Sequence, residues 1–211
     1  MLEFPGGVYA LTFETADTER LLRQVEAALA GGVAAVQYRD KSGDVARRHE
    51  QASELVALCR RYGAPLIVND DLRLADLAGA DGIHLGRDDG SLHEARIILG
   101  RDRFIGASCY QSLDLALAAQ AAGADYVAFG SFFASPTKPE APRAGLDLLR
   151  NAAPAIRVPL VAIGGITLAN APQLLDAGAD SLAVLSALFD APNVQTAAHD
   201  LNQLFETESE E

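Results

Sequence analysis

The sequence is poor in several residue types, and each shortage excludes a class of protein. It has no tryptophan, one methionine and two cysteines among 211 residues. Cys59 and Cys109 lack the spacing of a metal-ligand pair, so we expect free thiols rather than a zinc site or a disulfide. No apolar run approaches the ~20 residues that a membrane-spanning helix needs, and no basic region precedes the first apolar residues. We therefore expect a cytoplasmic protein without a signal peptide.

Positive charge is also scarce. Lysine and arginine number 17 against 29 aspartates and glutamates, which gives a formal net charge of -12. Such a charge repels nucleic acids and anionic membranes, so we expect neither as a partner. An anionic small molecule still binds where cations, backbone N–H groups and a metal gather locally. The only lysines in the sequence are Lys41 and Lys138.

One phrase recurs along the chain: AGGVAAVQY at 30–38, AGADGIHLG at 78–86, AGADYVAFG at 122–130 and AGADSLAVL at 177–185. Each copy predicts a helix that ends in alanine with a capping glycine, followed by a short buried strand. Further strands are expected at 8–12, 65–69, 104–107 and 159–163. Amphipathic helices are expected at 18–30, 44–61, 91–99, 112–121 and 168–177.

Strands that alternate with helices predict parallel βαβ units of the α/β class. Eight strands without a GxGxxG fingerprint after the first favour a single (β/α)8 TIM barrel over a doubly wound nucleotide-binding sheet. We assign residues 1–205 to the barrel. The acidic segment 206–211 is expected to be a disordered tail.

In such a barrel, functional side chains follow the carboxyl ends of the strands. The second strand runs into Gln37, Arg39 and Lys41, which strand alternation places on one side, while Tyr38 and Asp40 face the other. An arginine fork and a lysine point charge suit phosphate oxygens. Solvated surface charge is the alternative that the sequence leaves open.

Carboxylates follow the next two strands. Asp70 and Asp71 come after the third strand, and Asp88 and Asp89 after the fourth. Beside a basic cluster, such oxygens suit Mg²⁺ shared with a diphosphate. Capping of the following helices by these aspartates or by Ser91 is a compatible alternative. We predict Asp70 and Asp89 as the metal ligands and leave the roles of Asp71 and Asp88 open.

The remaining strand ends carry hydroxyls and glycines. Ser108 follows the fifth strand, and a long loop after the sixth contains Lys138. Gly165 follows the seventh strand, where backbone N–H groups can approach an anion, and the loops after strands seven and eight form the common phosphate site of this fold. The four histidines, His49, His84, His93 and His199, are expected to be structural. No Ser-His-Asp or Cys-His arrangement indicates a protein nucleophile.

Six segments in chain order resemble the thiamine phosphate synthase family over the whole chain: QYRDK at 37–41, ND at 69–70, HLGRDD at 84–89, GAS at 106–108, SPTK at 135–138 and AIGGI at 162–166. The resemblance implies a transferase that joins 4-amino-2-methyl-5-(diphosphooxymethyl)pyrimidine to 4-methyl-5-(2-phosphoethyl)thiazole. The products would be thiamine phosphate and pyrophosphate, formed by a dissociative, Mg²⁺-assisted substitution.

The resemblance also implies roles for individual residues. The pyrimidine diphosphate would be held by Gln37, Arg39, Lys41, Asn69, Ser108 and Lys138, with Arg39, Lys41 and Lys138 stabilising the leaving group. Mg²⁺ would be held by Asp70 and Asp89, and the thiazole phosphate by Ser135, Pro136, Thr137, Gly165, Leu185 and Ser186. The sequence departs from the family's usual residues at Arg87, Asp88, Cys109, Ser135 and Leu185.

Two other functions remain as alternatives. A thiazole tautomerase of the same superfamily would share the barrel and the thiazole phosphate site without needing the diphosphate cluster. A non-catalytic sensor of phosphorylated ligands would need no turnover at all. The sequence leaves open whether the chain forms a homo-oligomer.

Overall fold

The computed structural model describes residues 3–134 and 142–206. Within these residues, eight parallel strands close into a barrel in chain order, β1 to β8. The strands are β1 (Gly7–Leu11), β2 (Ala35–Tyr38), β3 (Leu66–Asn69), β4 (Gly82–Leu85), β5 (Phe104–Tyr110), β6 (Tyr126–Gly130), β7 (Leu160–Ile163) and β8 (Ser181–Val184). The predicted (β/α)8 TIM barrel is confirmed.

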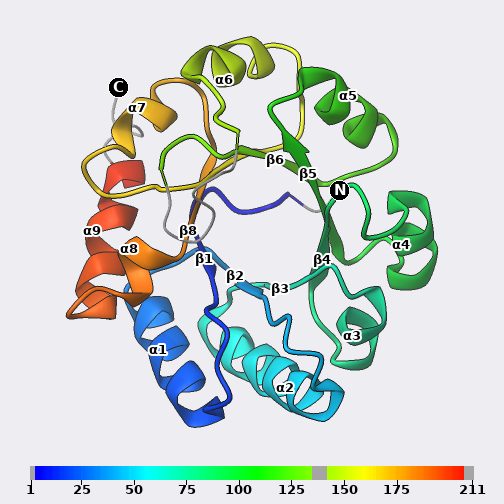
Figure 1. Cartoon of the computed structure of the whole chain (residues 1–211), viewed down its shortest axis with the longest axis vertical. Coiled ribbons are helices and arrows are strands. Elements are labelled where there is room, and N and C mark those ends of the chain that lie inside the picture. Colours follow the sequence, from blue (N-terminus) through cyan, green and yellow to red (C-terminus); the bar gives the residue numbers. More distant parts are fainter. Residues whose placement is uncertain (1–2, 135–141, 207–211) are drawn as a thin grey trace.

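Helices surround the barrel on its outside (Figure 1). They are α1 (Thr18–Ala30), α2 (Val45–Tyr62), α3 (Leu72–Leu77), α4 (Leu92–Leu99), α5 (Leu113–Ala121), α6 (Leu146–Ala152), α7 (Pro172–Leu175), α8 (Ser186–Phe189) and α9 (Val194–Glu206). In the described parts of the chain, no helix combines the length and apolar character needed to cross a membrane. Helix α9 includes Glu206, the first residue of the expected tail, and 207–211 lie outside the described residues.

Side-chain caps set where several helices begin. Asp44, Ser91 and Ser112 each accept a hydrogen bond from a backbone N–H in the first turn of α2, α4 and α5. These residues satisfy N–H groups that have no partner inside the helix, so they precede it instead of joining it. The helices predicted at 44–61, 91–99 and 112–121 therefore start one residue later than expected.

Three further sequence expectations about element ends are wrong. Helix α7 covers only Pro172–Leu175 of the expected 168–177, because Asn170 binds the backbone of Thr167 and Gly165 and holds that stretch as a turn. Strand β5 runs three residues past 107, since a bulge after Ser108 lets it continue pairing with β6. In the first copy of the repeated phrase, Gly31 is the C-terminal cap of α1, as expected. At the ends of α3 and α5 the cap is instead an alanine, and the glycine follows it.

The aspartate in the repeated phrase ties neighbouring strands together at their amino ends. Asp81, Asp125 and Asp180 directly precede β4, β6 and β8. Each carboxylate accepts a backbone N–H from the first or second residue of the preceding strand: Leu66 at 2.9 Å, Ile105 at 2.7 Å and Leu160 at 2.7 Å respectively. The repeated aspartate therefore has a structural role, at the end of the barrel away from the expected site.

We expect Asp125→Ala to lower the free energy of unfolding by about 3 kcal/mol, because Asp125 also pairs with the largely buried Arg96 at 2.6 Å. Asp180→Ala should cost about 1 kcal/mol, since its carboxylate makes no ion pair with a described residue. Urea unfolding of both variants checks the difference. Equal losses would contradict a stabilising role for the Arg96 pair.

The core has two layers separated by the sheet. The outer layer packs strands against helices, and the inner layer fills the barrel with residues that include Tyr9, Ile67, Tyr126 and Val161. The segment before β1 crosses the middle of the barrel (Figure 1), and the Phe4 ring stacks on the Tyr126 ring at 4.0 Å. The inner layer thus closes the amino end and leaves the carboxyl end available for a site.

Candidate active site

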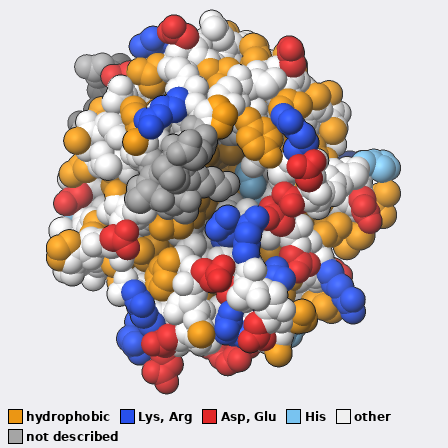
Figure 2. All heavy atoms as spheres, in the orientation of Figure 1, with side chains coloured by type: hydrophobic (Ala, Val, Ile, Leu, Met, Phe, Trp, Pro, Cys, Tyr) orange, Lys and Arg blue, Asp and Glu red, His pale blue; other side chains and the backbone are white. Residues whose placement is uncertain are grey.

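A cavity of 970 Å³ opens at the carboxyl ends of the strands. Its walls come from residues on or just after β1 to β8, which the closed barrel brings together although they are far apart in sequence. Lysine, arginine, aspartate and glutamate side chains gather near the middle of the face seen in Figure 2. The predicted site residues that line this cavity are Gln37, Arg39, Asn69, Ser108, Gly165, Leu185 and Ser186.

The end of β2 has the two-sided arrangement that alternation predicts. Gln37 and Arg39 line the cavity. Tyr38 points the other way and donates to Gln51 of α2 at 2.9 Å, and Asp40 lies 3.5 Å from Arg47 of the same helix. The Arg39 backbone N–H is held by Thr12 at 3.0 Å. Polar contacts on both sides of β2 therefore fix which side chains reach the cavity.

The two carboxylates predicted to bind Mg²⁺ lie next to each other. Partial burial, followed by the hydrogen bond and negative charge of Asp70, raises the pKa of Asp89. Lys41 lies on the same side, with its Nζ 3.4 Å from Asp70 Oδ2. Asp70 is held with φ at 65°, a conformation that non-glycine residues rarely adopt and that is common at functional sites.

This pair fits a magnesium ion that is completed by its ligand. In residues 3–134 and 142–206, no group of three or more histidine, cysteine, aspartate or glutamate side chains is gathered for metal binding. Mg²⁺ normally takes one or two carboxylates and fills its other positions with water and substrate phosphate. Two facing carboxylates that repel each other supply the negative charge such an ion neutralises.

The structure separates the two aspartates whose roles the sequence left open. Asp71 caps α3 by accepting from the Leu74 N–H at 2.9 Å, and it pairs with Arg48 at 3.0 Å. The Asp71 carboxylate therefore has a structural role. Asp88 lines the cavity beside Arg87, whose guanidinium lies 5.1 Å from the centre of the Tyr110 ring. Arg87 and Asp88, which depart from the family's usual residues, therefore belong to the cavity wall.

The floor of the cavity carries a hydrogen-bonded set of side chains that the sequence did not indicate. His84, expected to be only structural, lines the cavity and contacts Ser108 Oγ at 2.9 Å and the Tyr126 hydroxyl at 3.0 Å. Tyr126 contacts Tyr9 at 2.9 Å, and Gln37 donates to Tyr9 at 2.8 Å. Burial lowers the pKa of His84 to about 4. Inward alternation of Tyr9 and Tyr126 on their strands was the only available signal.

The glycine turn after β7 forms another wall. Gly164 and Gly165 have φ of 105° and 64°, and both line the cavity. A Cβ at Gly164 would collide with Ser131, and one at Gly165 would collide with the backbone of Ala134. The loop after β6 therefore packs directly on this turn. Four predicted ligands, Ser135, Pro136, Thr137 and Lys138, lie outside the described residues.

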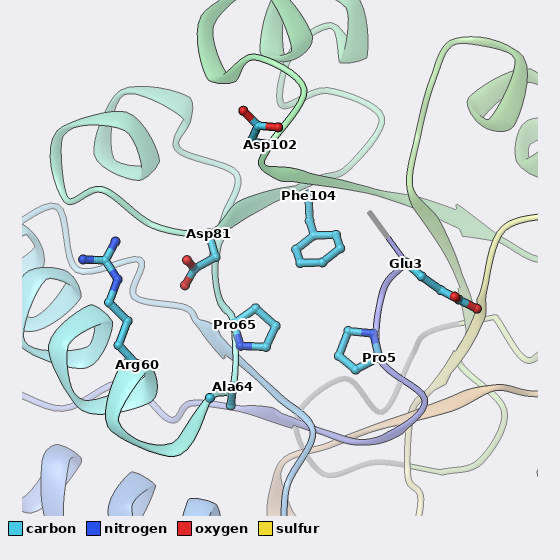
Figure 3. A pocket seen from close by; sticks show the side chains of 9 residues that line it. Glu3, Pro5, Arg60, Ala64, Pro65, Asp81, Asp102 and Phe104 are labelled. Carbon is cyan, nitrogen blue, oxygen red and sulfur yellow. The ribbon is translucent and has the colours of Figure 1, made fainter. Parts of the chain in front are cut away.

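A second cavity of 470 Å³ lies at the amino ends of the strands (Figure 3). Pro5, Pro65 and Phe104 border it, together with acidic residues. Asp81 and Arg60 in its wall already have partners: Asp81 accepts from Leu66, and Arg60 donates to the Gly79 carbonyl at 3.0 Å. The amino end of this fold serves stability, so the carboxyl-end cavity is the candidate site.

Comparisons with known proteins show the family of the chain. The family model described as thiamine monophosphate synthase matches residues 8–188. A protein of Thiobacillus denitrificans named thiamine-phosphate synthase is 77% identical over 211 residues, covering 100% of both chains. One of the same name from Chromobacterium violaceum is 55% identical, covering 92% of this chain and 94% of the relative.

A solved structure gives the same result. Thiamine phosphate pyrophosphorylase from Pyrococcus furiosus superposes with a TM-score of 0.85 at 34% identity, covering 95% of this chain and 96% of that one. The family model and the full-length relatives give the same family for this chain. This chain is a transferase that belongs to the thiamine monophosphate synthase family.

Proposed function

We propose that the carboxyl-end cavity joins 4-amino-2-methyl-5-(diphosphooxymethyl)pyrimidine to 4-methyl-5-(2-phosphoethyl)thiazole, forming thiamine phosphate and releasing pyrophosphate. The observation that carries this proposal is the Asp70–Asp89 carboxylate pair with Lys41 beside it, next in sequence to Asn69 and Asp88, which line the cavity, while the glycine turn after β7 forms another part of the wall. The carboxylate pair with Lys41 suits a diphosphate and its metal, and the glycine turn suits a phosphate monoester.

The proposed reaction needs stabilisation of a leaving group more than it needs a protein base. The bond between the pyrimidine methylene carbon and the diphosphate oxygen breaks, and the electron pair leaves with the pyrophosphate. Arg39 and Lys41 lie where they can offset that charge, and such groups contribute several kcal/mol when they are preorganised. Mg²⁺, held by Asp70 and Asp89, would supply further neutralisation of the leaving group when bound.

The second bond forms between the same methylene carbon and the thiazole nitrogen. That nitrogen carries its own lone pair, so the protein's task is to position the ring. The Gly164–Gly165 turn with Leu185 and Ser186 provides a wall on which the phosphate can be anchored. Anchoring a reactant this way replaces an encounter in solution with a reaction inside one complex.

The alternatives make different demands on the same cavity. A thiazole tautomerase would have no use for the paired carboxylates at the end of β3 and β4, and a sensor would bind without turnover. Incubating the protein with both substrates and Mg²⁺ should yield thiamine phosphate and pyrophosphate. Isomerisation of the thiazole phosphate alone, or binding without any product, would favour the tautomerase or the sensor respectively.

Lys138 offers a test from the sequence alone. We expect Lys138→Ala to lower turnover at least tenfold while changing the free energy of unfolding by less than about 0.5 kcal/mol, because loop substitutions seldom affect stability. Steady-state kinetics and urea unfolding of the same preparation check both numbers. Parallel losses of turnover and stability would refute the assigned role in neutralising the leaving group.

A further inference from the structure

The hydrogen-bonded set in the cavity floor forms one continuous chain across the barrel. It runs from Gln37 on β2 to Tyr9 on β1, then to Tyr126 on β6, His84 on β4 and Ser108 on β5. Tyr9, Gln37, Tyr126 and His84 are all buried, with exposed fractions from 0% to 7%. The buried tyrosine hydroxyl protons therefore depend on a neighbouring side chain of this hydrogen-bonded set for an acceptor.

Packing fixes the position of Tyr126, in the middle of this hydrogen-bonded set. A Cβ at Gly106 would collide with the Tyr126 ring, so the glycine admits the ring to the centre of the barrel. Phe4 stacks on one side of that ring, and the His84 ring lies at 25° to it with 5.5 Å between centres. The Tyr126 hydroxyl is thus fixed between Tyr9 and His84.

The Gln37 end sets the direction in which the protons point. Gln37 donates its Nε2 proton to the Tyr9 oxygen. Among the described residues Tyr9 then has only Tyr126 to receive its own proton. Tyr126 in turn donates to His84 Nδ1, which must be unprotonated, and the His84 proton sits on Nε2 facing Ser108.

The opposite direction leaves a buried proton without an acceptor. If His84 Nδ1 donated to Tyr126, then Tyr126 would donate to Tyr9, whose oxygen already accepts from Gln37. The proton of Tyr9 would then have no acceptor among the described residues, at a position only 2% exposed. Such a loss costs about 1–3 kcal/mol. Ser108, by contrast, is only partly buried at the cavity wall, where its proton is open to a ligand or water.

We infer that Tyr9, Tyr126 and His84 are positioning residues that fix His84 as the Nε2–H tautomer, so that Ser108 presents its hydroxyl proton to an acceptor atom of the ligand. This inference deepens the proposed function and rests on it for the identity of the ligand. The acceptor is a ring nitrogen of the pyrimidine, because Ser108 contacts the buried His84, whereas Lys41 and Asp70, which suit the diphosphate and its metal, are partly exposed.

The tautomer can be read in the free protein, without substrate or metal. Histidine labelled with ¹⁵N should show His84 with a protonated Nε2 and an unprotonated Nδ1, assigned by the signals missing in His84→Gln. Tyr126→Phe removes the donor to Nδ1 and should shift His84 toward the other tautomer. An Nδ1–H form in the unmodified protein, or an unchanged tautomer in Tyr126→Phe, would overturn the inference whether or not the chain makes thiamine phosphate.

Tyr38→Phe is the matched control, because Tyr38 is 2% exposed and bonds Gln51 outside the barrel. Both substitutions remove one buried hydroxyl, but only Tyr126→Phe should move the His84 signals. It should also raise KM for the pyrimidine substrate about tenfold, roughly the value of one misdirected hydrogen bond, with KM for the thiazole unchanged. If Tyr38→Phe raised the pyrimidine KM by the same factor, the effect of Tyr126→Phe would be explained by a general loss of packing.

Inorganic pyrophosphate with Mg²⁺ tests which part of the substrate Ser108 contacts. Tyr126→Phe should leave the affinity for this probe unchanged if the acceptor is a ring nitrogen. A tenfold loss of pyrophosphate affinity would overturn the ring assignment and place a phosphate oxygen at Ser108.

Discussion

Replacing Asp89 with asparagine should lower kcat/KM by roughly a hundredfold while leaving the melting temperature of the substrate-free protein unchanged or slightly higher. The loss is expected because the metal, which would help to neutralise the departing diphosphate, would lose one of its two proposed carboxylate ligands. Stability should not fall, since Asp70 already opposes the charge on Asp89 and asparagine removes that repulsion. Its amide oxygen can still accept from the Gly86 N–H, as Asp89 does at 3.0 Å.

Asp88→Asn is the control for this prediction. It removes the same charge one residue away, from a side chain that also lines the cavity. Steady-state kinetics at several Mg²⁺ concentrations should show a large defect in Asp89→Asn and a small one in Asp88→Asn. Equal defects would mean that net charge in the cavity matters and that Asp89 has no special part in holding the metal.

Strand alternation was enough to predict which side chains of β2 reach the cavity, because β2 pairs with β1 and β3 without a bulge and so keeps the period of two. Gln37 and Arg39 face inward, and Tyr38 and Asp40 face α2, as expected. The closed barrel likewise made the meeting of Asp70 with Asp89 predictable, since they follow adjacent strands. These successes depend on local periodicity and on one topological rule.

Pairings across the barrel could not be read in the same way. Tyr9 and Tyr126 are 117 residues apart, and their contact depends on the missing side chain of Gly106. A histidine on a buried strand has the same pattern whether it packs passively or joins Ser108 to a tyrosine. The left-handed backbone of Asp70 is also invisible in sequence, because aspartate adopts ordinary conformations far more often.

Gly165→Ala should lower the free energy of unfolding by about 3 kcal/mol and raise KM for the thiazole phosphate at least tenfold. Two separate costs contribute. A left-handed backbone, with φ at 64°, costs an alanine about 1 kcal/mol. The added Cβ would also meet the carbonyl of Ala134, which is backbone and cannot rotate away as a flexible side chain would. The turn must therefore shift, and with it the wall proposed to anchor the phosphate.

Gly63→Ala separates these two costs. Gly63 has φ at 71°, almost the same as Gly165, but no atom lies within 4 Å of the position its Cβ would take. It follows α2 at the amino end of the barrel, away from the cavity. Gly63→Ala should thus lose only about 1 kcal/mol, the cost of the backbone conformation, and keep both KM values. If the two variants lose equal stability and Gly165→Ala still binds the thiazole normally, the close packing of this turn would have no role in holding the phosphate.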